Sequence, residues 1–183
     1  MPVFVCFLLG LTPLLWLLLY SWQGMLGANP VELWLRLSGD WGLWCLLLTL
    51  ALSPLSRWRM LQGVLRWRRM VGLFSFFYAL LHLTVYLVLE RALSWEDIAQ
   101  DIGKRPYITV GILAFVLLLP LALTSPRRIM LRLGSTRIGW HRLVYPAALL
   151  VILHFFLQTR ADWHVPLLHA VVLAVLLAWR LVR

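Results

Sequence analysis

Five histidines are the residues of this sequence whose chemistry best suits a cofactor in apolar surroundings. The sequence has no HExxH pattern, no Ser–His–Asp grouping and no GxGxxG or Walker loop, which excludes the metallopeptidases and nucleotide-binding domains that those patterns indicate. Two neutral imidazoles facing each other in an apolar cavity suit haem, whose iron has two axial positions. The histidines therefore predict haem binding if the fold brings two of them together. They are His82, His141, His154, His164 and His169.

The composition indicates an integral membrane protein. Of the 183 residues, 62% are hydrophobic and 13% are charged, about half the charged share of a soluble domain, and the mean hydropathy is +0.86. A soluble fold of this length cannot bury so much apolar surface, and a disordered chain would contain far less of it. The two cysteines, Cys6 and Cys45, both lie in apolar runs and cannot form a disulfide-rich scaffold.

Six apolar runs predict an all-α bundle of six transmembrane helices that forms a single domain over residues 1–183. The runs cover residues 3–22, 41–56, 70–89, 107–123, 143–157 and 165–179. A span needs about 17–20 residues, so the flanking Trp and Arg complete the short ones. The first run lacks a positively charged start, and we expect a retained helix instead of a signal peptide. Capping patterns predict two shorter interfacial helices, one from Asn29 to a stop at Gly39 and one from Ser94 to Gly103. No internal repeat is evident.

The positive charge predicts the orientation in the membrane. The net charge is +10, and twelve of the seventeen Lys and Arg lie in the 57–69 and 125–142 segments and at the C-terminus. By the positive-inside rule, we expect both termini to be cytoplasmic. The charge is then a topology signal and a contact for membrane lipid, and we expect no nucleic-acid binding.

Three histidines are predicted to lie at one level in the outer half of the membrane. At ~1.5 Å per residue, His82 lies about 18 Å from the cytoplasmic end of its span, and His154 and His169 lie about 16 Å from theirs. No carboxylate lies in the middle of a predicted span. A stripe of mostly small residues on the helix of His82 leaves room for a flat cofactor or a close helix. The alternative, that these histidines only pack and hydrogen-bond, stays open. The stripe is Gly72, Ser75, Ala79, His82 and Tyr86.

The other candidate residues have two interpretations each. His141 lies 13 residues before His154, about 20 Å along a helix, which suits a second, inner haem or a contact to a haem propionate. His164 is expected to be solvated in the outer turn. Arg68, Arg69 and Arg142 are candidates for holding a haem propionate or a flavin phosphate, although topology and anionic lipid also explain them.

Several segments resemble the MsrQ family, formerly YedZ, in the family's own order. The likeness runs from about Gly24 to the end of the sixth span, and the segments are specific when taken together. The family belongs to the ferric reductase-like transmembrane superfamily. The segments are 27–31, 68–73, 79–86, 105–111 and 140–145.

The resemblance implies a haem-binding membrane subunit of a periplasmic methionine sulfoxide reductase system. It implies b-type haem, one or two per chain, with His82, His154 and His141 in the ligand positions, and a bound flavin mononucleotide (FMN). His169 matches no family ligand, although its depth makes it a possible competitor. The implied electron donor is the quinone pool or a cytoplasmic flavin reductase, and the implied acceptor is MsrP, a periplasmic molybdopterin enzyme.

The sequence therefore predicts a transmembrane electron-transfer subunit. The chain itself is expected to carry out no substrate chemistry, which resides in the partner. The alternative from another class is a cofactor-free membrane scaffold or transporter whose histidines only pack.

Overall fold

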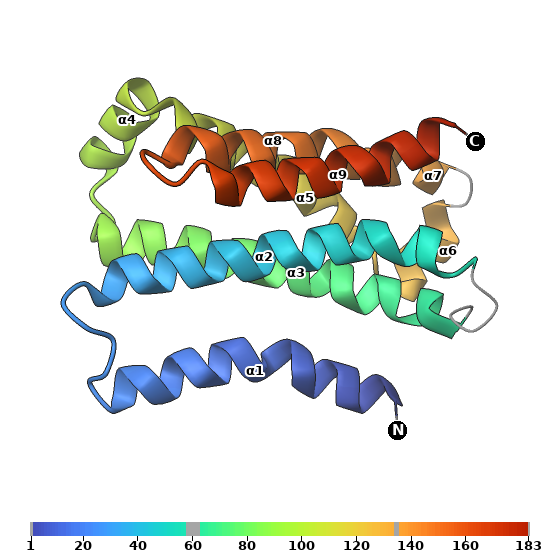
Figure 1. The fold of residues 1–183 in the computed structure, drawn as a ribbon, viewed down its shortest axis with the longest axis horizontal. Coiled ribbons are helices and arrows are strands. Elements are labelled where there is room, and N and C mark those ends of the chain that lie inside the picture. The colour runs from blue at the N-terminus through green and yellow to red at the C-terminus, as the bar shows by residue number, and fades with distance from the viewer. Residues whose placement is uncertain (1, 58–62, 134–135, 183) are drawn as a thin grey trace.

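The computed structural model describes residues 2–57, 63–133 and 136–182. Within these ranges the secondary structure is helical (Figure 1). Arg59 and Arg183, two of the arginines in the topology argument, lie outside the described residues. The helices are α1 (Pro2–Trp22), α2 (Pro30–Leu55), α3 (Leu65–Val85), the π-helical turn η2 (Tyr86–Glu90), α4 (Trp95–Lys104), α5 (Pro106–Leu123), α6 (Arg127–Leu133), α7 (Thr136–His141), α8 (Val144–Gln158) and α9 (His164–Leu181).

Six helical stretches are long and apolar enough to cross a membrane, as predicted. They are Phe4–Trp22, Pro30–Leu55, Leu65–Glu90, Pro106–Leu123, Gly139–Gln158 and His164–Leu181. Many large apolar side chains on these helices are exposed, which suits a surface that faces lipid.

The second span differs from its prediction because α2 does not stop at Gly39. It starts where expected: Asn29 Oδ1 accepts a hydrogen bond from the Glu32 amide at 3.3 Å, and Pro30 takes the first helical position. It then continues through Gly39 to Leu55, so the predicted interfacial helix and the predicted 41–56 span are one element. Asp40 therefore lies inside a spanning helix, which corrects the expectation that spans hold no inner carboxylate.

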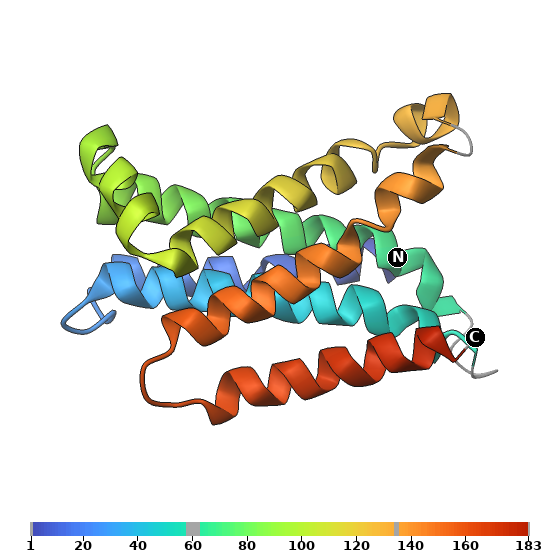
Figure 2. The same ribbon diagram turned by 90° about the horizontal axis from the view of Figure 1, so that it is seen from above.

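The helices run roughly side by side along the long axis of the molecule (Figures 1 and 2). In Figure 1, α1 lies on one side of the α2–α3 pair, and α5, α8 and α9 lie on the other side. The most extensive contacts are those of α2 with α3 and of α5 with α8. Both chain ends lie at one end of the bundle, together with α6 and α7. We call this the arginine-rich end, and we call the opposite end, where α2 and α5 begin, the pocket end.

The small-residue stripe on α3 packs against α2. Ser75 Oγ donates a buried hydrogen bond to the Gly42 carbonyl at 2.9 Å, and the Cα of Gly42 faces Ala79 closely enough that an added Cβ would lie 3.5 Å from its backbone nitrogen. The fold combines the two interpretations of the stripe: it packs closely against α2 at Ser75 and Ala79, and Ser75, Ala79, His82 and Tyr86 also line a cavity.

The chain reverses sharply between η2 and α4. Ala92 and Leu93 have φ values of 47° and 59°, which non-glycine residues adopt rarely. Beyond this strained turn, α4 begins at Ser94, whose side chain accepts from the Asp97 amide, as its capping pattern predicts. The reversal brings α4 back beside α5 at the pocket end of the bundle.

Candidate cofactor site

His82 on α3 and His154 on α8 face each other inside the bundle. Their ring centres are 6.1 Å apart, and the ring planes are perpendicular at 89°. An imidazole nitrogen binds a metal at about 2.0–2.1 Å, so one metal ion between two imidazoles holds their ring centres roughly 6 Å apart. The observed spacing suits one metal ion between these two rings.

A backbone carbonyl on a neighbouring helix fixes each of the two rings. His82 Nδ1 lies 2.8 Å from the Leu35 carbonyl oxygen, and His154 Nδ1 lies 2.6 Å from the Tyr107 carbonyl oxygen. A carbonyl only accepts, so Nδ1 carries the proton and donates in both rings. Nε2 of each ring is then the nitrogen with a lone pair, which is the arrangement of a metal-binding histidine supported by a backbone carbonyl.

A glycine makes room for each ring. A Cβ added to Gly111 would lie 2.7 Å from His154 Nδ1, and one added to Gly39 would lie 3.2 Å from His82 Nδ1. In both cases the glycine follows the residue with the accepting carbonyl by about one helical turn, as Gly39 follows Leu35 and Gly111 follows Tyr107. Gly39, interpreted from the sequence as a helix stop, is therefore a packing glycine within α2.

The two half-sites are copies separated by 72 residues. The offset relates Leu35 to Tyr107, Gly39 to Gly111 and His82 to His154, and both histidine–carbonyl hydrogen bonds connect residues 47 positions apart. The helix pairs α2–α3 and α5–α8 thus present their histidines in the same local arrangement, a shared spacing that the sequence analysis missed. The signal was present as Gly-x42-His, which occurs at both copies, and as Ser-Pro at 53–54 and 125–126.

A cavity of about 580 Å³ extends from the two histidines toward the pocket end. This volume is within the usual range for a small-molecule or cofactor site. Apolar side chains line it near the rings, among them Leu43, Leu46, Phe115 and Leu118. Charged side chains line the mouth, with cations Arg36, Arg91, Arg105 and Arg160 beside carboxylates Glu32, Asp40, Glu90 and Asp162.

Asp101 on α4 organises two of these arginines. Its carboxylate pairs with Arg91 Nη2 at 2.6 Å and with Arg105 Nε at 3.2 Å, and it accepts from the Tyr86 hydroxyl at 2.9 Å. Arg105 also donates to the Tyr107 hydroxyl, and chiefly this interaction raises the pKa of Arg105 above its ordinary value. One carboxylate thus holds two guanidinium groups at the cavity mouth. Arg91 Nε is buried without a hydrogen-bond partner among the described residues.

Comparison with known proteins identifies the family. Residues 38–153 match the model of the ferric reductase-like transmembrane component family. The chain is 51% identical over 180 residues to a protein of Rhodospirillum rubrum that is named protein-methionine-sulfoxide reductase heme-binding subunit MsrQ. The matched residues make up 96% of this chain and 85% of that protein. This chain belongs to the MsrQ family. Relatives with the same name in Herminiimonas arsenicoxydans and Caulobacter vibrioides are 44% and 42% identical, over 95% and 92% of this chain and 81% and 80% of theirs. No solved structure matches the chain.

Within this MsrQ fold, the histidine pair comes from the third and fifth spans. His169 on α9, equal to them in predicted depth, is turned elsewhere: its Nδ1 donates to the Val165 carbonyl of its own helix at 2.7 Å. Its buried ring lies 4.6 Å from the Trp44 ring and 5.7 Å from the Phe155 ring, and it does not line the cavity. Its predicted depth made His169 a possible competitor ligand. Its ring, however, lies outside the cavity that His82 and His154 line.

Neither of the remaining two histidines lines the cavity. His164 begins α9 with its side chain 86% exposed, 3.9 Å from Asp162, as expected for a residue of the outer turn. His141 ends α7 at the arginine-rich end, and the chain breaks its helix before α8 begins at Val144. The stretch from His141 to His154 is therefore interrupted by a turn at Arg142 and Leu143, so it is not one regular α-helix.

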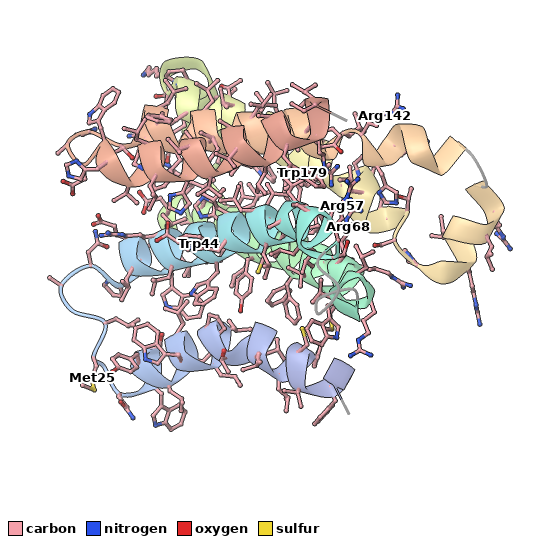
Figure 3. All side chains as sticks on the ribbon, turned by 45° about the vertical axis from the view of Figure 1, so that its right-hand side comes forward. Met25, Trp44, Arg57, Arg68, Arg142 and Trp179 are labelled. Carbon is pink, nitrogen blue, oxygen red and sulfur yellow. The ribbon has the colours of Figure 1, made fainter. Side chains whose placement is uncertain are left out.

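The predicted cofactor arginines lie at the arginine-rich end, away from the cavity mouth. Arg68 is partly buried, whereas Arg69 and Arg142 are exposed, and Figure 3 shows Arg68 and Arg142 at this end. The arginines at the mouth of the histidine cavity are a different set, Arg36, Arg91, Arg105 and Arg160. The sequence analysis missed them because it counted them only as outer-loop charge.

Proposed function

We propose that this chain is a haem-containing electron-transfer subunit that passes electrons across the bacterial inner membrane to a periplasmic methionine sulfoxide reductase of the MsrP type. Membership of the MsrQ family supports the haem and the reductase system, because the relatives are named heme-binding subunits of such a system. Substrate catalysis would reside in the partner.

The observation that carries the proposal is the facing pair His82 and His154. Among the described residues, no group of three or more His, Cys, Asp or Glu side chains could hold a bare metal ion. Two protein ligands therefore suit a metal whose other ligands come from a macrocycle, and the ring spacing and the freed Nε2 atoms fit the two axial positions of a b-type haem.

The chain's own residues would hold, orient and shield this group. Leu35 and Tyr107 fix the rings through their carbonyl oxygens, and apolar side chains of α2 and α5 exclude water from the inner cavity. Asp101 pairs with Arg91 and Arg105 at the mouth, and these two arginines would bind the propionates. When bound, haem supplies a one-electron redox centre, and ligation by two histidines favours electron transfer over oxygen binding.

The remaining parts of the route rest on the family resemblance. The donor is the quinone pool or a cytoplasmic flavin reductase, with FMN as a second cofactor. Arg68, Arg69 and Arg142 are candidates for contacts to the flavin phosphate or to a propionate. His141 is the candidate ligand of a second, inner haem, which would need a ligand other than histidine on α3.

A haem assay and a turnover assay test the proposal. We expect the purified chain to give a pyridine haemochrome with at least one haem per chain and a low-spin Soret spectrum. A catalytic amount of the periplasmic reductase should reoxidise the reduced chain completely only when methionine sulfoxide is also present as the final electron acceptor. A chain with no Soret band even after haem supplementation would end the proposal and favour the cofactor-free scaffold.

A further inference from the structure

Ser38 on α2 is a fully buried serine beside the ring of His82. Its exposed fraction is 0%, and its Oγ lies 3.5 Å from His82 Nδ1. The same helix presents the Leu35 carbonyl oxygen to this nitrogen at 2.8 Å. Two oxygen atoms of α2 therefore lie near the one proton that His82 Nδ1 carries.

The hydroxyl hydrogen of Ser38 is used within α2. Its Oγ lies 2.6 Å from the Trp34 carbonyl oxygen and 3.1 Å from the Leu35 carbonyl oxygen, and the shorter distance is that of a strong O–H···O hydrogen bond. The Leu35 oxygen already has two donors, the Gly39 amide within the helix and His82 Nδ1, and these occupy both of its lone pairs. Ser38 therefore donates to the Trp34 carbonyl, which leaves the lone pairs of its Oγ for His82.

The Ser38 oxygen thus gives the Nδ1–H group of His82 a second acceptor. The contact of 3.5 Å is longer than the hydrogen bond to Leu35, so it supplements that bond and does not replace it. Partial negative charge beside Nδ1–H makes the imidazole richer in electron density, so that Nε2 donates more strongly to a metal.

The structure gives His154 no equivalent of this hydroxyl. Val110 has the place on α5 that Ser38 has on α2, three residues after the accepting carbonyl and directly before the packing glycine. Valine offers no oxygen, and His154 Nδ1 donates to the Tyr107 carbonyl at 2.6 Å. The two facing rings therefore differ in their supporting contacts, and Ser38 acts on His82.

We propose that Ser38 is a positioning residue that strengthens His82 as an electron donor and thereby lowers the reduction potential of the haem iron between the two histidines. A stronger axial donor stabilises oxidised iron, and hydrogen bonding around the ligands is one of the means by which a protein sets this potential. The effect on the iron rests on the proposed function, whereas the contact with the ring does not. The alternative is that Ser38 only bonds back to its own helix, as serines in helices often do.

The experiment removes the hydroxyl and restores it. Ser38→Ala removes it and Ser38→Thr keeps it. Thr49→Val is the matched control, because Thr49 Oγ1 also donates to a carbonyl one turn earlier in α2, at 2.8 Å, but does not line the histidine cavity. One readout is the midpoint potential of the low-spin haem that His82→Ala removes. The other is the Nδ1 proton resonance of His82 in the apoprotein labelled with ¹⁵N-histidine, assigned by its absence from His82→Ala.

We expect Ser38→Ala to favour reduction of the haem by about threefold, because His82 loses a weak second acceptor. At about 59 mV per tenfold change for one electron, the potential should rise by about 28 mV. The His82 proton resonance should move to higher field, since this proton is then less strongly hydrogen-bonded, and that of His154 should stay. Ser38→Thr and Thr49→Val should match the wild type in both readouts.

An unchanged potential in Ser38→Ala, or an unchanged His82 resonance, would overturn the proposal and leave Ser38 a structural role within α2. A lower potential would also overturn it, because the hydroxyl would then compete with His82 for the Leu35 carbonyl. A preparation without a Soret band contradicts the proposed function, and the effect on the iron fails with it. The proton resonance of the apoprotein then decides the contact with His82 alone.

Discussion

The hydrogen bonds of His82 and His154 decide what these two rings can do. Each imidazole gives its Nδ1 proton to a backbone carbonyl, so neither ring needs another side chain to fix its tautomer. The carbonyls belong to helices that pack tightly on the histidine helices, and the rings are therefore oriented before any ligand arrives. Because the rings are preorganised, binding of a cofactor would cost little side-chain conformational entropy.

The first prediction concerns the ligands. His82→Ala and His154→Ala should each abolish the same low-spin haem, because loss of one imidazole leaves the iron without an axial bond. His164→Ala should change nothing, and His141→Ala should remove at most a second haem. The measurement is haem per chain with the absorption spectrum of each variant. His169→Ala is the sharpest control, because this residue has the same depth but a ring hydrogen-bonded within its own helix. If His169→Ala loses the spectrum while His154→Ala keeps it, the pairing of α3 with α8 is wrong.

The second prediction concerns the two packing glycines. Gly111→Ala would place a Cβ 2.7 Å from His154 Nδ1 and 2.9 Å from its Cε1, closer than real contacts allow, so the ring must move. Since disturbed supporting contacts typically cost about 10–100-fold in metal affinity, we expect a haem affinity lower by about that factor. Gly39→Ala should have a smaller effect, because its contacts to His82 are 3.2 and 3.3 Å.

Gly103→Ala is the matched control for the glycine series. A Cβ at Gly103 meets nothing within 4 Å, so titration of this variant with haem should give the wild-type affinity. If Gly111→Ala also binds haem as the wild type does, the ring of His154 does not need the position that the structure gives it.

At the scale of elements, α4 and the strained turn before it build the cavity mouth. The turn at Ala92 and Leu93 sends the chain back, and Asp101 on α4 then reaches both Arg91 and Arg105. A short polar helix thus positions two cations that belong to the end of η2 and the start of α5. Without it, Arg91 would be partly buried with no counter-charge, which is costly.

The third prediction uses a haem without free propionates. The wild type should bind haem about tenfold or more tighter than haem dimethyl ester, because the ester cannot accept charge-assisted hydrogen bonds as a carboxylate does. Arg91→Gln and Arg105→Gln should each weaken the binding of haem and leave the binding of the ester unchanged. The ratio of the two affinities should therefore fall. Equal ratios in wild type and variants, measured by haem titration of the apoprotein, would show that the propionates lie elsewhere. Lys104→Gln, whose side chain contacts Gln100 on α4, is the charge-matched control.

Much of the element pattern could be predicted from the sequence because it depends on local properties. Apolar run length gives the six spans, and the caps at Asn29 and Ser94 give the starts of α2 and α4. The predicted end of the first of these helices, at Gly39, was wrong because a glycine has two possible roles. It can end a helix, or it can leave space within a helix for the ring of a neighbouring side chain. Only the position of His82 on another helix decides between them.

The sequence predicts how deep the site histidines lie in the membrane, but not which of them face one another. Distance along a helix places His82, His154 and His169 at one level, whereas the choice of two among three depends on how each helix is rotated in the bundle. The shared spacing could have made that choice, because Gly-x42-His occurs at His82 and at His154. It was missed because the two copies share few other identical residues, so it becomes visible only when the contacts are known.

The whole molecule divides charge between its two ends. Arginines and carboxylates both line the mouth of the histidine cavity, whereas the segments at the opposite end contain arginines and no Asp or Glu. The arginine and carboxylate charges therefore roughly cancel at the cavity mouth. The arginine-rich end instead has a net positive potential that attracts anionic lipid or phosphate.

The last prediction is the orientation of the bundle. The positive-inside rule counts Lys and Arg near span ends, and twelve of seventeen belong to the segments and terminus at the arginine-rich end. We therefore expect that end to be cytoplasmic and the cavity mouth to face the periplasm, where an electron acceptor would dock.

Single cysteines test this orientation in a background without Cys6 and Cys45. A membrane-impermeant maleimide should label Glu96→Cys on the exposed side of α4 in cells with a permeable outer membrane. It should label Arg132→Cys on α6 only after lysis. The reverse labelling pattern would place the cavity mouth in the cytoplasm. Electrons could not then leave this haem directly for a periplasmic reductase, so the experiment tests the direction of the proposed route as well as the topology.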